Sequence, residues 1–232
     1  MNRSAELEMM DLPGQPPELL IDDLRNLRLI NRYLGCYRNI ERALARLIDP
    51  KTTRRFSLLD VGTGSADIPA LIARWAQRRQ VAARISALDR ETVTVEQAAV
   101  QTRGYREISL LRGDAMNLPF RAASFDYVLA SQLLHHFSDE QIIAAIRAWA
   151  RLARRAVIVN DLVRHPLAYH GIRLLAKSFT RNEMTRMDGP RSVARACTVD
   201  EWRALFRRAD VGRFDVIPAF PYRMLGLIWP GS

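Results

Sequence analysis

The sequence is poor in cysteine and lacks any long apolar run. Its two cysteines, Cys36 and Cys197, lie far apart and follow no metal-binding or disulfide pattern, which predicts a reduced, cytoplasmic setting. No apolar run approaches the roughly 18 residues that a membrane span needs. The first residues include Glu6, Glu8 and Asp11 in place of an apolar core, so a secretory signal is not expected.

Lysine is also scarce. Only Lys51 and Lys177 are lysines among the 35 basic residues, so arginine carries almost all of the net charge of +10. A basic chain raises the question of a nucleic-acid partner. The arginines are spread out, however, without a dense run or interleaved aromatic residues, and residues 1–24 hold six acids and one base. Composition therefore disfavours a nucleic acid, and the arginine excess fits a GC-rich coding bias equally well.

A glycine turn at residues 60–69 is the most informative feature that is present. The sequence there reads Asp-Val-Gly-Thr-Gly-Ser-Ala-Asp-Ile-Pro. It follows a short apolar run at 56–59 and precedes apolar residues at helical spacing, Ile68, Leu71, Ile72 and Trp75. In the order strand, turn, helix, glycines let the backbone approach a ligand and the helix N-terminus offers free N–H groups. The turn therefore predicts a site for a nucleotide-like ligand.

Asp67 indicates which kind of ligand the turn suits. A dinucleotide fingerprint reads Gly-x-Gly-x-x-Gly, with a pyrophosphate over the turn. Gly62 and Gly64 match it, but its last glycine is replaced by Asp67. A carboxylate opposes a pyrophosphate and suits a ligand that carries an ammonium or a sulfonium. We therefore expect a ligand other than NAD.

Polar residues also stand at the ends of the next predicted strands. Asp89 ends the apolar run 85–88, where a carboxylate can accept both hydroxyls of a ribose. Asp114 follows the third strand and is placed to accept from an adenine amino group. Ser131 ends the fourth predicted strand, 124–131.

This constellation resembles the class I S-adenosylmethionine (SAM) methyltransferases, with Ala66 in place of the third glycine of their motif I. Residues 56–161 are most similar to the ubiquinone/menaquinone-type subfamily, through the phrases at 67–68, 112–115, 118–120 and 124–126. The resemblance implies SAM as cofactor, a small-molecule acceptor and an α/β fold. That fold is a Rossmann-like, seven-stranded, mostly parallel sheet with helices on both faces. The cofactor-binding residues that it implies are Asp60, Gly62, Thr63, Gly64, Asp67, Ile68, Asp89, Arg90, Asp114, Ala115 and Ser131.

The chain before the turn predicts an arm and a helical cap. Residues 1–15 are expected to be a loose arm because Pro13, Gly14 and Pro16 interrupt them. Two helices should follow, so residues 1–50 form arm and cap and residues 51–232 form the SAM-binding core. The cap offers Tyr33, Tyr37 and Arg38 as candidate contacts to the cofactor, although Tyr37 is at least as well explained by packing.

The segment 162–197, after the fifth strand, is longer than the plain core needs. Its apolar and basic residues at helical spacing predict an amphipathic helix with a polar end at 185–191. Ligands of open α/β sheets bind at the carboxyl ends of the strands, so we expect this segment to be an inserted helical lid over the acceptor. Its predicted inward face comprises Leu167, Ile172, Leu175 and Phe179. Capping boxes predict helix starts at 138–141 and 198–201.

His135 and His136 are the candidate catalytic residues. They follow the fourth strand, and histidine is the usual proton acceptor near neutral pH. The alternative is that they only pack or solvate the next helix. His165, Tyr169 and His170 on the lid are further candidates. The third and fourth ligands of a metal site appear at no recognised spacing, so no metal is expected.

These features predict an enzyme of secondary metabolism that transfers a methyl group to an O or C atom of a small phenolic, quinol or polyketide-like acceptor. One alternative is a SAM-binding protein with a repurposed, non-methylating activity. Another is an RNA methyltransferase. The RNA methyltransferase is disfavoured, because the sequence at 131–134 reads Ser-Gln-Leu-Leu where such an enzyme would carry an Asn-Pro-Pro-Tyr motif. The oligomeric state stays open, with a homodimer as one option.

Overall fold

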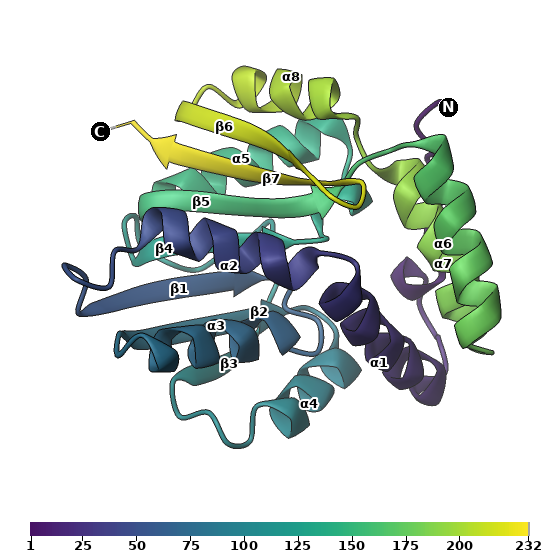
Figure 1. Cartoon of the computed structure of the whole chain (residues 1–232), viewed down its shortest axis with the longest axis horizontal. Coiled ribbons are helices and arrows are strands. Elements are labelled where there is room, and N and C mark those ends of the chain that lie inside the picture. The colour runs from purple at the N-terminus through teal and green to yellow at the C-terminus, as the bar shows by residue number, and fades with distance from the viewer. Residues whose placement is uncertain (232) are drawn as a thin grey trace.

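A computed structural model describes residues 1–231 and shows helices on both faces of a central sheet (Figure 1). Over these residues the sheet has seven strands in the order β3-β2-β1-β4-β5-β7-β6. β7 runs antiparallel to β5 and β6, and the other pairs are parallel. The predicted fold is therefore confirmed. The strands are β1 (Arg55–Val61), β2 (Ala82–Asp89), β3 (Ile108–Arg112), β4 (Phe125–Ser131), β5 (Ala153–Leu162), β6 (Gly212–Ala219) and β7 (Arg223–Pro230).

The two faces of the sheet form separate apolar cores because successive side chains of a strand alternate between faces. Leu58 packs on one face with helices α2 (Cys36–Leu47) and α3 (Asp67–Arg78). Leu59 packs on the other face with α5 (Asp139–Leu152) and α8 (Val199–Ala209). Both predicted capping boxes are present, at the starts of α5 and α8.

Helices also surround the carboxyl ends of the parallel strands. They are α1 (Pro17–Tyr33), α4 (Thr92–Gln101), α6 (Pro166–Phe179) and α7 (Glu183–Arg195). A small apolar cluster joins Leu20 and Leu24 of α1 to Met184 of α7. Figure 1 shows α6 and α7 side by side at this edge of the molecule. No helix in residues 1–231 is both long and apolar enough to cross a membrane.

The segment 162–197 differs from the expected single helix. It folds into two helices, and the predicted polar end belongs to α7, which Asn182 caps by accepting from the N–H of Thr185 at 2.9 Å. The predicted inward face is wrong, because Leu167 is 65% exposed and Phe179 is 39% exposed. α7 takes the inner position since its polar residues find partners there, and α6 lies outside it.

The first residues also differ from the expected loose arm. Residues 1–12, which we call the arm, lie along α7 and include the short helix η1 (Met9–Asp11). The N–H groups of Met9 and Met10 donate to the carboxylate of Asp188 at 2.7 and 3.0 Å. Ser4 donates its N–H to the carbonyl of Ala194 at 3.0 Å. These partners lie far away in the sequence, so local composition did not reveal them.

Candidate functional site

The glycine turn after β1 closes tightly on the end of β2. The N–H groups of Gly62 and Thr63 donate to the carbonyl of Leu88 at 2.8 and 2.9 Å. Gly62, Gly64 and Ala66 all have positive φ, at 70°, 55° and 58°. Left-handed backbone is cheap for glycine and costs an L-residue roughly 1–2 kcal/mol. Ala66 therefore adopts a backbone conformation that would be less costly for glycine, the residue that the motif has at this position.

A cavity of about 780 Å³ opens beside this turn, at the carboxyl ends of β1, β2 and β4. This volume is within the range of pockets that hold cofactors and drug-sized ligands. Its lining includes residues of the arm, α1, the turn, several strand ends and the loop after β4, which lie far apart in the sequence. Each predicted site residue lines it, namely Asp60, Gly62, Thr63, Gly64, Asp67, Ile68, Asp89, Arg90, Asp114, Ala115, Ser131, His135 and His136.

Two buried acids hold the turn and its surroundings in place. Asp60 accepts from the hydroxyl of Thr63 at 2.7 Å, and burial raises its pKa to about 7. Asp67, also buried, accepts from Asn31 at 3.1 Å and from the Tyr37 hydroxyl at 3.0 Å. Asp67 thus ties α1 and α2 to the turn. None of the three predicted cap contacts lines the cavity: Tyr37 hydrogen-bonds to Asp67, and Tyr33 and Arg38 are exposed.

Asp89 is placed to bind polar hydrogens at the end of β2. One carboxylate oxygen accepts from the N–H of Gly64 at 2.9 Å and the other from the N–H of Glu91 at 3.1 Å. Each oxygen keeps a second lone pair for a ligand hydroxyl. Burial raises the pKa of Asp89, which the backbone hydrogen bonds oppose. Together with Asp67 and Asp114, it lines the cavity with carboxylates. This donor set fits a ligand with a ribose and a positive charge, as SAM has.

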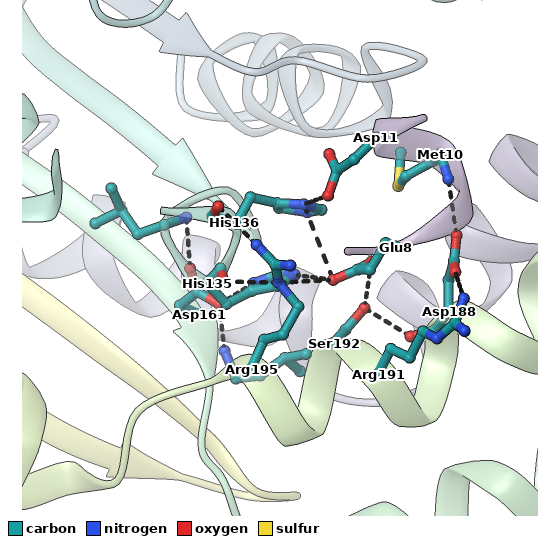
Figure 2. Close-up of polar contacts among 12 residues, drawn as sticks. Glu8, Met10, Asp11, His135, His136, Asp161, Asp188, Arg191, Ser192 and Arg195 are labelled. Atoms are coloured by element: carbon teal, nitrogen blue, oxygen red, sulfur yellow. Dashed lines mark hydrogen bonds and ion pairs between the residues drawn. The ribbon is translucent and has the colours of Figure 1, made fainter. Parts of the chain in front are cut away.

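The two adjacent histidines also line the cavity and belong to the short helix η2 (Leu134–His136) (Figure 2). The imidazole of His135 is buried, and its Nδ1 lies 2.7 Å from Asp161 at the end of β5. Nδ1 of His136 lies 2.9 Å from the carboxylate of Asp11. Glu8 faces both rings, with its Oε1 3.6 Å from Nε2 of His135 and 3.9 Å from Nδ1 of His136.

Arg195 of α7 fixes the loop that carries the histidines. Its guanidinium donates to the carbonyls of His135 and His136 at 3.2 and 2.7 Å, and to the carbonyl of Glu6 at 2.8 Å. Arg3 adds hydrogen bonds to the carbonyls of Phe137 and Arg195, at 2.9 and 2.7 Å. One network therefore joins the arm, α7 and the histidine loop.

The structure also separates residues that the sequence suggested together. His165, Tyr169 and His170, the further candidates for a base, belong to the start of α6 and do not line the cavity. Conversely, sequence patterns missed Glu8, Asp11, Asp161 and Arg195. The position of Asp161 at the end of the fifth strand was a usable signal. Nothing local marked the other three.

Comparisons with known proteins agree with this geometry. Residues 58–156 match the family model of a methyltransferase domain. The chain is 26% identical to the uncharacterized methyltransferase YcgJ of Bacillus subtilis over 162 aligned residues. The alignment covers 68% of this chain and 58% of YcgJ. The chain thus spans less than two thirds of that relative.

Solved structures share the fold at low sequence identity. The human N-acetylserotonin methyltransferase in complex with SAM has a TM-score of 0.66 and 16% identity, covering 99% of this chain and 63% of that one. The [4+2]-cyclase SpnF has a TM-score of 0.53 and 21% identity, covering 76% and 58%.

Residues 58–156 thus match a methyltransferase domain, and the seven-stranded fold and the lining of the cavity support a methyltransferase of the class I, S-adenosyl-L-methionine-dependent type.

Proposed function

We propose that this protein transfers a methyl group from SAM to an O or C atom of a small phenolic, quinol or polyketide-like acceptor in secondary metabolism. One observation supports the proposal most. A single cavity is lined both by the glycine turn, with its carboxylates, and by a pair of adjacent histidines, of which His135 is buried. The first part suits the cofactor and the second part suits removal of a proton.

Residues of the strand ends would hold the cofactor. Asp89 would accept the ribose hydroxyls, Asp114 would lie beside the adenine, and the carboxylate of Asp67 would favour the positive charge. When bound, SAM supplies a methyl group that is already activated by a sulfonium. The protein then has to position the acceptor, exclude water and take up a proton.

The histidine pair would take up that proton. His136 is the more exposed of the two imidazoles, at 14%, and His135 is enclosed between Asp161 and Glu8. A phenol or enol must lose its proton as its oxygen or carbon accepts the methyl group, and an imidazole is suited to accept it near neutral pH. The result would be the methylated acceptor and S-adenosylhomocysteine.

The rest of the lining favours an acceptor with an apolar body. Apolar side chains of the arm, α1 and the loop after β4 form this part of the wall, namely Leu7, Met10, Leu12, Leu20, Leu24, Leu27, Leu133 and Phe137. Residues 1–12 and 162–197 together would act as the lid, with the arm and α7 as its inner layer. Closure of such a lid excludes water from the reaction.

The repurposed activity remains the alternative, because SpnF, whose fold is similar, is named as a cyclase. One experiment separates the two. The purified protein is incubated with SAM and a panel of phenols, quinols and linear polyketide mimics, and the products are analysed by mass spectrometry. We expect a product that has gained one methyl group, together with S-adenosylhomocysteine. Tight binding of S-adenosylhomocysteine without a methylated product from any acceptor would favour the alternative.

A further inference from the structure

The carboxylate of Glu8 is in an unusual position for a buried acid. Glu8 is 1% exposed, and its Oε2 accepts from the hydroxyl of Ser192 at 2.7 Å. Its Oε1 has no hydrogen-bond partner among residues 1–231. A buried carboxylate oxygen without a partner is costly. This oxygen points toward the two imidazoles (Figure 2).

The surrounding donor atoms are arranged as ligands of one ion. Glu8, His135 and His136 each have one donor atom within 4.8 Å of those of the other two. The carboxylate of Asp11 is not part of this group, although its Oδ2 lies 2.9 Å from Nδ1 of His136. Bonds of about 2.0–2.2 Å in a tetrahedral site place ligand atoms about 3.3–3.6 Å apart. The Glu8–His135 separation of 3.6 Å matches this spacing, and the Glu8–His136 separation of 3.9 Å needs only a small closure.

Asp161 prepares His135 to be a ligand. The carboxylate accepts from Nδ1 of His135 and is itself oriented by the N–H groups of Leu134 and Leu162, at 3.0 and 2.7 Å. The proton is thereby held on Nδ1, and the lone pair of Nε2 faces Glu8. A carboxylate behind an imidazole in this way is the usual support of a metal-ligating histidine.

Arg195 does not serve as the missing partner of Glu8. Its Nε lies 3.8 Å from Glu8 Oε1, which is too far for a hydrogen bond. Its N–H groups donate to backbone carbonyls instead. The carboxylates of Glu8, Asp11 and Asp161 still outnumber the two guanidinium groups that face them, those of Arg195 and of Arg90, which lies 3.9 Å from Asp11, so the site favours a cation.

We propose that Glu8, His135 and His136 bind a divalent first-row transition-metal ion in the cavity, with the carboxylate of Asp11 beside His136. Two imidazoles and one carboxylate, with the fourth position open, suit Zn²⁺ or Co²⁺ and do not suit Mg²⁺, which prefers oxygen ligands. The sequence does not predict this site, because Glu8 lies far from the two histidines along the chain and meets them only when the arm docks.

The ion would extend the proposed function, on which this part of the inference rests. A cation at this place can bind an acceptor hydroxyl and lower its pKa. It would then favour the deprotonated acceptor, whose proton would leave to water, and the histidines would serve as ligands in place of the base of the proposed function. Binding of the ion itself can be tested without any acceptor.

The test uses the full chain without a histidine tag, stripped of metal with EDTA. Zn²⁺ is titrated by calorimetry and Co²⁺ by visible absorption, with Mg²⁺ for comparison. We expect one Zn²⁺ per chain, competition between Zn²⁺ and Co²⁺, and no comparable binding of Mg²⁺. Hydrogen exchange in residues 1–12 should slow when Zn²⁺ is added, because Glu8 belongs to the arm and Asp11 lies beside the site.

Variants identify the site. Glu8→Gln and Asp11→Asn should each weaken Zn²⁺ binding at least tenfold, and Asp161→Asn should weaken it about 10–100-fold. Asp11 is partly exposed, so its variant tests the site even if Glu8→Gln fails to fold by circular dichroism. Matched controls are Glu6→Gln on the same arm and His170→Asn on α6, which should bind Zn²⁺ as the unaltered protein does.

The results that would overturn the metal site differ from the results that would overturn the proposed methyl transfer. Absence of Zn²⁺ and Co²⁺ binding would overturn the metal site. So would binding that survives both Glu8→Gln and Asp11→Asn, or binding that His170→Asn removes. A protein that binds one Zn²⁺ through these residues but methylates no acceptor would retain the metal site and lose the proposed function.

Discussion

Asp161 and His135 form a buried pair in which the carboxylate determines where the imidazole proton resides. The two side chains meet at 2.7 Å, and both are almost fully enclosed. Burial alone would raise the pKa of Asp161, but the neighbouring His135 and the N–H of Leu162 outweigh it and lower the pKa. Asp161 is therefore an acceptor near neutral pH, Nδ1 of His135 is the donor, and Nε2 faces the cavity end where Glu8 lies.

The histidine pair gives the first prediction. His136→Asn removes the more exposed imidazole without changing the cofactor end of the cavity. A positioned general base contributes about 10²–10⁴-fold, so kcat for a phenolic acceptor should fall by roughly this factor. Affinity for S-adenosylhomocysteine should stay unchanged in calorimetry. His170→Asn, on exposed α6, is the control and should retain full activity. An unchanged kcat in His136→Asn would remove this residue from the reaction.

The second prediction concerns Asp89. Asp89→Ala removes acceptors for ribose hydroxyls, and hydrogen bonds to a charged group contribute about 1.5–3 kcal/mol each. It also removes the acceptor of the Gly64 N–H, which helps to shape the turn. Affinity for SAM in calorimetry should fall at least tenfold while circular dichroism shows a retained fold. Glu96→Ala, an exposed change on α4, should leave affinity unaltered. Equal affinities of the two variants would contradict the assigned role.

The cofactor end of the site could be predicted from the sequence because its information is local. Asp60, Asp89 and Asp114 each stand beside a strand in the sequence, and parallel strands bring their carboxyl ends to one edge. The acceptor end could not be predicted in the same way. Glu8 and Asp11 reach it only through tertiary contacts, such as those between Arg195 and the arm.

The proposed lid, too, could be predicted only in part from the sequence. Apolar spacing in 162–197 predicted an amphipathic helix correctly in kind, but spacing does not reveal which helix lies inside. The inner helix is α7, whose buried Asp188 and Thr185 are polar and would have been assigned to a solvent-facing surface. Their partners on the arm and α1 make that burial tolerable. The exposed Leu167 on α6 has no such partner to place it inside.

The third prediction concerns the stability of this lid. In α6 Ala176 is buried and most other side chains are exposed, whereas α7 buries residues along its length. Local opening is easiest where few apolar contacts would be lost. Hydrogen exchange should therefore be fast in α6 and slower in α7 without ligand. Addition of S-adenosylhomocysteine and acceptor together should slow exchange in the arm and α7. Exchange in α6 as slow as in the central strands would contradict a lid at this place.

The fourth prediction concerns a buried acid between α1 and α7. Asp23 is 1% exposed and accepts from the hydroxyl of Thr185 at 2.6 Å. Burial raises its pKa to about 7, the Thr185 hydrogen bond opposes this, and the nearby Asp188 and Asp22 add to it. In the unfolded chain Asp23 would have a pKa near 3.8. Between these two values the folded state holds a proton that the unfolded state releases.

It follows that Asp23 lowers the free energy of unfolding as the pH rises from about 4 to about 7, and that the loss persists above pH 7. Asp23→Asn cannot ionise and can still accept from Thr185. The advantage of the variant over the unaltered protein in urea unfolding should be smallest near pH 4 and reach about 1–4 kcal/mol at pH 8. Glu18→Gln, exposed on the first turn of α1, should show no such difference. If Asp23→Asn is instead less stable at pH 8, the ionised carboxylate stabilises the contact between α1 and α7, and burial does not govern its pKa.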